Sequence, residues 1–144
     1  MSFGARSKAR ECAVQMLFRW SIEEPSFLSA HATLLEDHIS QYWQNFEVPV
    51  FAQETANHFV KNVIEYLPQI DEAIQKNSQN WRFERIAKVD LCILRLAVYE
   101  LLFEQQTPEQ VVINEAIELA KKFSTQEAHA FINGVLAGVV QSRM

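Results

Sequence analysis

Glycine, proline and cysteine are scarce in this chain of 144 residues, which contains three glycines, four prolines and two cysteines. Few glycines and prolines leave long runs of helix-forming residues uninterrupted, and no segment alternates polar and apolar residues with a period of two. The sequence therefore predicts an all-α fold. Hydrophobic residues make up 49% of the chain, which is enough to form the core of one domain.

The two cysteines and the hydrophobic runs both argue against export or membrane insertion. Cys12 and Cys92 lie far apart in apolar surroundings and form no CxxC pair, so we expect buried, reduced thiols of a cytosolic protein. The N-terminus lacks the apolar stretch of a secretory signal. The most apolar run, 89–103, is too short to span a bilayer and contains three charged residues, which is typical of a core helix.

Motifs of catalysis are absent as well. The sequence has no Gly-rich phosphate loop, nucleophile elbow, HExxH, zinc-ligand spacing or dinucleotide fingerprint. His31 and His38 lie seven residues apart without a third ligand, so we interpret them as surface histidines. We expect no catalytic residue, no metal and no cofactor, and we expect a binding protein rather than an enzyme.

Positive charge is concentrated at the N-terminus of a chain whose net charge is -5. The first ten residues hold Arg6, Lys8 and Arg10 and no acid, whereas the remaining residues hold ten basic and 18 acidic side chains. These cations are either a solvated helix end or a contact for a polyanion. Because cations at a helix N-terminus oppose the helix dipole, a bound polyanion would explain their position.

Apolar residues at three- and four-residue steps predict four helices in the first half of the chain. They cover about 5–22, 26–46, a third helix from Pro49 and a short fourth from Pro68. The polar stretch 76–80 is the candidate connection between subdomains of about 1–77 and 78–144. The expected inward residues are Ala9, Cys12, Ala13, Met16, Leu17 and Trp20; Leu34, Leu35, Ile39, Tyr42 and Trp43; Phe51, Thr55, Phe59, Val63 and Leu67; and Ile70, Ala73 and Ile74.

The second half predicts a helix over about 84–103 that is apolar around most of its circumference and belongs at the centre of a helical bundle. Arg95 lies inside it and needs a partner, for which Glu100 or a helix-end carbonyl is the natural choice. Two further helices follow, each with a capping-box signature: Thr107 with Gln110, and Ser124 with Glu127. Their expected buried stripes are Ile113, Ala116, Ile117, Ala120 and Phe123, and Ala128, Phe131, Ile132, Val135 and Val139.

Gly134 lies inside the last predicted helix, where glycine destabilises by about 1 kcal/mol relative to alanine. A close helix crossing at Gly134 would explain it. The alternative is that the helix simply tolerates a glycine.

Long strings of this sequence resemble the NusB transcription antitermination factors. They are 6–17 (RSKARECAVQML), 81–86 (WRFERI), 93–101 (ILRLAVYEL), 113–121 (INEAIELAK) and 131–136 (FINGVL). Residues 26–75 match only in hydrophobic character. The resemblance implies one domain, 1–144, with about seven helices in two packed antiparallel bundles. It also implies a bacterial cytoplasmic, RNA-binding factor that pairs with the ribosomal protein NusE and binds single-stranded boxA RNA in the transcription elongation complex. Such a factor helps RNA polymerase read through terminators, especially in ribosomal RNA operons.

The resemblance also implies roles for individual residues. Arg6, Lys8 and Arg10 match the family's arginine-rich, RNA-binding motif, although some members have consecutive arginines where this chain has Arg6, Ser7 and Lys8. Cations on phosphates, together with aromatic rings under bases, are the usual means of holding single-stranded RNA.

Three further positions match in the second half. Phe131 matches an aromatic residue that faces RNA, and Glu127, one turn earlier, matches a position on the same RNA-binding surface. Asp90 matches an acidic position at the NusE contact. From the residues alone, Phe131 could equally fill the core, and Asp90 could be an ordinary surface charge.

Two other functions remain open at this point. RNA cytosine methyltransferases carry a NusB-like RNA-recognition domain, but this chain ends at Met144 without a Rossmann-type region, which argues against methyl transfer. The third possibility is a homodimeric helical adaptor that hides the basic residues.

Overall fold

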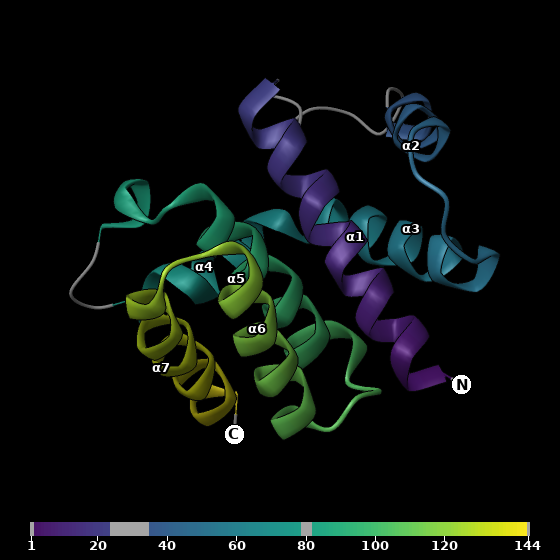
Figure 1. Ribbon diagram of the computed structural model, residues 1–144. Helices are drawn as coiled ribbons and strands as arrows, with labels where there is room; N and C mark the ends of the chain where they lie inside the picture. Colours follow the sequence, from purple (N-terminus) through teal and green to yellow (C-terminus); the bar gives the residue numbers. More distant parts are fainter. Residues whose placement is uncertain (1, 24–34, 79–81, 144) are drawn as a thin grey trace. The chain divides into compact units, whose positions relative to one another are not determined.

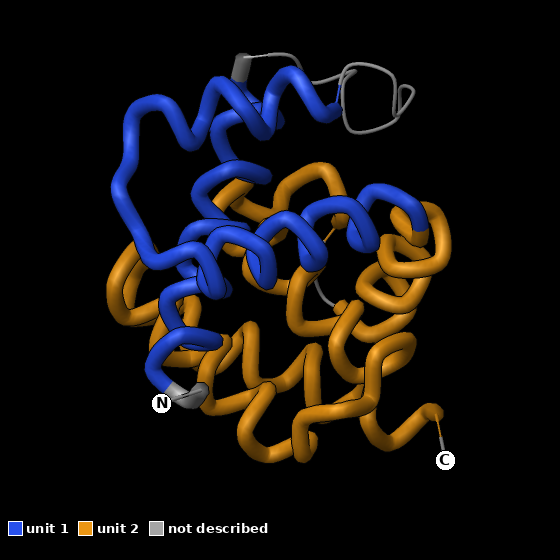
Figure 2. The backbone as a smooth tube through the Cα atoms, turned by 90° about the vertical axis from the view of Figure 1, so that its right-hand side faces the viewer, with its two compact units in different colours: residues 1–65 blue, residues 66–144 orange. Residues whose placement is uncertain are grey.

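The computed structural model describes residues 2–23, 35–78 and 82–143, and this part of the chain contains helices and no strand (Figure 1). The predicted all-α class is confirmed. The chain divides into two compact units, 1–65 and 66–144, which Figure 2 colours blue and orange.

The first unit contains α1 (Ser2–Glu23), α2 (Leu35–Gln44) and α3 (Val50–Glu65). The second contains α4 (Leu67–Asn77), the 3-10 helix η3 (Phe83–Arg85), α5 (Lys88–Tyr99), the π-helix η4 (Glu100–Glu104), α6 (Glu109–Phe123) and α7 (Gln126–Ser142). The sequence groups α4 with the N-terminal helices, whereas in the structure α4 packs against α5 and α7 of the second unit.

The core of the first unit is built by α1 packing against α3. All six residues of the predicted α1 stripe are buried. The α3 stripe is partly wrong, because Phe51 is 49% exposed while Ala52 and Ala56 occupy the buried face together with Phe59. Proline positions predict the starts of α3 and α4 well, since α3 follows Pro49 and Pro68 lies in the first turn of α4.

Side-chain hydrogen bonds attach α2 to the other two helices of its unit. The Tyr42 hydroxyl donates to Gln15 Oε1 at 2.8 Å, and Trp43 Nε1 donates to Asn57 Oδ1 at 2.8 Å. His38, predicted as a surface residue, is half-buried, and its ring lies edge-on to Trp20 at a centroid distance of 5.9 Å. The predicted start of this helix at Ser26, together with His31 and Leu34, falls outside the described residues.

The second unit is organised around α5, which contacts α4, α6 and α7. Every residue from Cys92 to Tyr99 is buried, so the expectation of a central helix is confirmed. The predicted continuous helix over 84–103 is nevertheless wrong. Ile86 and Ala87 are extended, α5 starts at Lys88, and the last turns are π-helical.

Arg95 finds a partner that the sequence did not predict. Its Nε and Nη2 atoms donate to Asp71 Oδ1 and Oδ2 of α4, both at 2.9 Å, so neither Glu100 nor a helix-end carbonyl takes the expected place. A bidentate pair of this kind is among the stronger ionic contacts in proteins. It fixes the position of α4 on α5.

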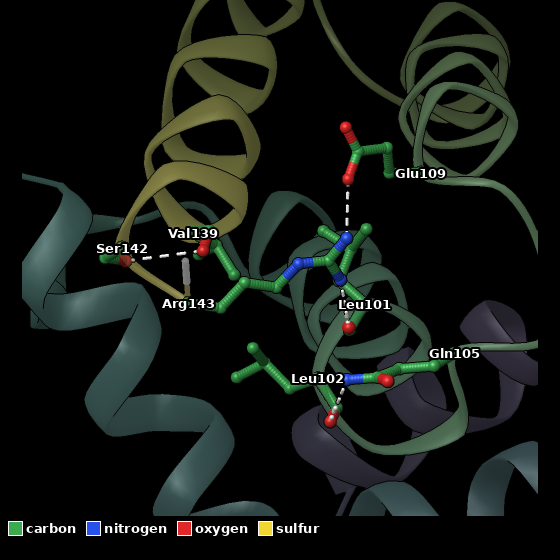
Figure 3. Close-up of polar contacts among 7 residues, drawn as sticks. All are labelled: Leu101, Leu102, Gln105, Glu109, Val139, Ser142 and Arg143. Carbon is green, nitrogen blue, oxygen red and sulfur yellow. Dashed lines mark hydrogen bonds and ion pairs between the residues drawn. The ribbon is translucent and has the colours of Figure 1, made fainter.

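Arg143 links the π-helix η4, which follows α5, to the start of α6, as Figure 3 shows. Its guanidinium donates to the Leu101 carbonyl of the π-helix and, at 2.5 Å, to Glu109 Oε2 at the start of α6. Gln105, with a left-handed φ of 56°, ends the π-helix, and its side-chain amide donates to the Leu102 carbonyl at 3.2 Å. The Leu101 and Leu102 carbonyls of the π-turn therefore accept hydrogen bonds from side chains.

The close helix crossing occurs at Gly138 and not at Gly134. A Cβ at Gly138 would lie 2.5 Å from Asn77 Oδ1 of α4, whereas no described atom lies within 4 Å of a Cβ at Gly134 outside its own helix. The prediction for Gly134 is wrong, and its alternative, a tolerated glycine, describes this position.

Neither predicted capping box forms as expected. Pro108 is the N-cap of α6, and Gln110 donates to Asn114 Oδ1 at 3.0 Å. Thr125 is the N-cap of α7, and among the described atoms no side chain caps either helix. The buried faces of these two helices also differ from the predicted stripes. In α6 the buried residues include Val112 and Leu119 as well as Ile113, Ala116 and Ala120. Three residues predicted to be buried, Ile117, Phe123 and Phe131, are only half-buried.

Candidate nucleic-acid interface

The three cations predicted to bind RNA lie on the first turns of α1 and differ in exposure. Lys8 is exposed, Arg6 is half-buried, and Arg10 is buried with 3% of its surface accessible. The interpretation of this segment as a solvated helix end is therefore wrong for Arg10.

An aromatic ring of α3 explains how two cations are accommodated near the core. The guanidinium carbons of Arg6 and Arg10 lie 5.3 and 5.8 Å from the centroid of the Phe59 ring, which is itself fully buried. A ring face attracts a cation, and Arg also packs well through its planar group. Lys8 Nζ instead lies 3.7 Å from Glu11 Oε2, one helical turn away, and the Lys8 side chain is exposed whereas that of Glu11 is mostly buried.

The other three predicted site residues come together in one pocket of the second unit. Asp90, Glu127 and Phe131 line a cavity of about 210 Å³, and its remaining walls are Arg85, Ile86, Ala87, Thr125 and Ala128. Phe131 is half-buried, so it is not a fully enclosed core residue. The pocket thus combines apolar walls and a partly accessible ring with two carboxylates and one guanidinium.

Local backbone structure places these side chains at the pocket. The extended residues Ile86 and Ala87 bring the chain from η3 into α5, which puts Asp90 in the first turn of α5. The link of two residues between α6 and α7, which pack together as a helical hairpin, leads into the first turns of α7, which carry Glu127 and Phe131.

Asp90 is held by a residue from the α6–α7 link. Ser124 Oγ donates a hydrogen bond of 2.5 Å to Asp90 Oδ1, and Asp90 is 9% exposed. A nearly buried carboxylate requires such a donor, because burial without a partner costs several kcal/mol. Asp90 is therefore not the ordinary surface charge that the sequence left open.

Two residues of this region escaped the sequence-based prediction. Arg85 lines the pocket, but in the sequence it is one of many charged residues near the predicted helix start. Ser124 carried the signature of a helix cap, and that signature concealed its bond to Asp90. Neither role could be found without knowing that the α6–α7 link approaches the start of α5.

These features define a class of protein, namely an all-helical binding protein with a cationic helix start in one unit and a mixed apolar and acidic pocket in the other. The model of the NusB family matches residues 7–141. The chain belongs to the NusB family.

Curated relatives agree with this assignment. The transcription antitermination protein NusB of Thermodesulfovibrio yellowstonii is 37% identical over 145 residues, covering 96% of this chain and 93% of the relative. That of Agathobacter rectalis is 42% identical over 132 residues, covering 92% and 96%. NusB antitermination factors are not enzymes, which agrees with the binding protein expected from the sequence.

Solved structures of the family share the fold. Thermotoga maritima NusB superposes with a TM-score of 0.79 at 30% identity, covering 94% of this chain and 90% of that one. A crystal structure of the antitermination factors NusB and NusE in complex with double-stranded RNA contains a chain with a TM-score of 0.76 at 26% identity, covering 96% and 97%. In the described part of the present chain, no helix is both long enough and apolar enough to cross a membrane.

Proposed function

We propose that this chain is a transcription antitermination factor that pairs with the ribosomal protein NusE and binds boxA RNA. In this role it joins the transcription elongation complex in the bacterial cytoplasm and helps RNA polymerase pass terminators, especially in ribosomal RNA operons. The observation that carries the proposal is the family match over residues 7–141, supported by the likeness to a chain from a NusB–NusE–RNA complex.

The proposed division of labour follows the chemistry of each group. Arg6, Lys8 and Arg10 attract phosphates, Phe131 supplies a ring for base stacking beside Glu127, and Asp90 contacts NusE. Base stacking on an aromatic ring contributes about 1 to 3 kcal/mol per base. The partial accessibility of Phe131 is compatible with stacking.

The burial of Arg10 determines how the cationic residues are best tested. Truncating Arg10 disturbs the packing on Phe59, so loss of RNA binding by that variant would not distinguish a contact from misfolding. The informative variant is Arg6→Ala with Lys8→Ala. Its matched control is Lys61→Ala with Lys76→Ala, which removes the same charge from exposed positions of α3 and α4.

We expect the double variant at Arg6 and Lys8 to weaken boxA binding strongly while NusE pairing persists. If all three cations contact phosphates, the slope of log affinity against log salt is about -2 in the native chain and about -0.7 in the variant. Fluorescence anisotropy of labelled boxA RNA at several salt concentrations measures this slope. An unchanged slope, or the same loss in the control variant, contradicts the assignment.

A further inference from the structure

Ser124 uses its hydroxyl on Asp90 instead of on the helix that it precedes. Its position before α7 is that of a capping residue, yet Thr125 is the N-cap and Ser124 Oγ donates to Asp90 Oδ1 at 2.5 Å. Departures from a local rule are concentrated at functional sites in natural proteins. This one places the link between α6 and α7 against the Asp90 carboxylate.

The Ser124 hydrogen bond restricts the rotation of the Asp90 side chain. Asp90 is the third residue of α5, where the helix dipole favours a negative charge, and it lines the pocket of the second unit. Because Oδ1 accepts from Ser124, the orientation of the whole carboxylate, including Oδ2, is set. A carboxylate that is already oriented loses less conformational entropy when it accepts a bond from a ligand.

The charges of the pocket select the class of ligand. Asp90 and Glu127 contribute two carboxylates against the one guanidinium of Arg85. The excess of negative charge favours a cation beside Asp90 and disfavours an RNA phosphate there, whereas the ring of Phe131 can still stack on an uncharged RNA base. The apolar walls formed by Ile86, Ala87 and Ala128 suit the methylene stem of a lysine or arginine side chain.

We propose that Ser124 is a positioning residue, which holds the Asp90 carboxylate so that the pocket receives an arginine or lysine side chain of the protein partner. This inference rests on the proposed pairing with NusE. It assigns Ser124 a role in partner binding and assigns the pocket a basic side chain as its ligand.

Isothermal titration of purified NusE into the full chain, without RNA, tests the proposal. Ser124→Ala removes the donor, and we expect NusE affinity to fall about two- to tenfold, the cost of ordering one side chain on binding that the native hydrogen bond avoids. Ser124→Thr retains a hydroxyl on an extended backbone that suits threonine, and it should restore most of the affinity. Ser40→Ala, at an exposed position of α2, is the matched control and should bind as the native chain does.

A double-mutant cycle separates positioning from a general effect on the α6–α7 link. In the Asp90→Asn background, Ser124→Ala should cause no further loss of NusE affinity, because the carboxylate that it orients is gone. An equal loss in both backgrounds overturns the proposal. Thermal denaturation of each variant confirms that it is folded before titration.

The remaining outcomes distinguish this inference from the proposed function. If the native chain binds NusE and Ser124→Ala binds equally well, only the role of Ser124 is refuted. If the native chain does not bind NusE at all, the proposed pairing fails and the inference fails with it. If Asp90→Asn and Ser124→Ala weaken boxA binding but not NusE binding, the pocket receives RNA, and the assignment of a basic side chain is wrong.

Discussion

Arg95 carries a positive charge into the apolar centre of the second unit. The guanidinium is buried, and the Asp71 carboxylate that it contacts is mostly enclosed. An ion pair in such a place adds little net stability compared with well-packed apolar residues, because both charges must be dehydrated. Removing one member has a much larger effect, since the other is left in an apolar environment.

We predict that Arg95→Ala lowers the free energy of unfolding by about 3 kcal/mol, because it leaves Asp71 without its partner and opens space beside α4. Urea denaturation measures the change. Lys76→Ala breaks an exposed pair with Glu72 and should change stability by less than about 0.5 kcal/mol. Similar values for the two variants would contradict the importance of burial.

One buried thiol and two buried tyrosine hydroxyls predict how the free energy of unfolding depends on pH in the alkaline range. Burial raises the pKa of the Cys12 thiol and of the Tyr42 and Tyr99 hydroxyls above their ordinary values of 9.0 and 10.0. In the unfolded chain these groups ionise first, so the folded state binds more protons at high pH.

The free energy of unfolding should therefore be constant near pH 8 and fall as the pH rises above about 9. Urea denaturation at a series of pH values measures this. Tyr42→Phe removes one of the groups and should make the fall shallower, although it also loses the bond to Gln15. A steeper fall in this variant would show that other groups control the alkaline limit.

At the scale of elements, the crossing of α4 and α7 depends on one small residue. Gly138 lies against Asn77, whose Nδ2 donates to the Ala73 carbonyl at 2.8 Å, and a Cβ there would also lie 3.1 Å from Asn77 Cγ. Gly134, one turn earlier on α7, is exposed. The same substitution should therefore have different effects at the two positions.

We predict that Gly134→Ala raises the free energy of unfolding by about 0.5 to 1 kcal/mol through helix propensity, whereas Gly138→Ala gives no gain or a loss. Thermal or urea denaturation of both variants checks this. In an Asn77→Ala background the obstacle at Gly138 is smaller, so Gly138→Ala should become less unfavourable there. A gain at Gly138 equal to that at Gly134 in the native background would refute the close crossing.

Periodicity and proline positions predicted most of the helices because burial repeats along a helix in a regular way. The α1 stripe and the helices that follow Pro49 and Pro68 are examples. Capping was not predictable at Ser124, because a serine hydroxyl serves a helix amide or a distant carboxylate equally well. The partner of Arg95 was missed for the same reason, since Asp71 lies 24 residues away in sequence. The choice between such partners is made by tertiary packing.

At the scale of the whole molecule, an acidic chain presents its proposed RNA contacts in two places. The net charge of -5 argues against general attraction to nucleic acid, so the proposed RNA binding assigns the contacts to the cationic start of α1 and to the ring of Phe131. The sequence identified these positions through the family resemblance. It could not indicate that Arg10 is buried against Phe59, or that Asp90, Glu127 and Phe131 share a pocket.

The central claim is that one boxA RNA contacts both α1 and α7 when NusE is present. Ultraviolet crosslinking of boxA RNA to the mixture of this chain and NusE, followed by mass spectrometry of the peptides, tests it most directly. We predict RNA crosslinks in the first ten residues and at Phe131, both more abundant with NusE than without it. Crosslinks confined to NusE, or to peptides of this chain that contain neither segment, would contradict the claim.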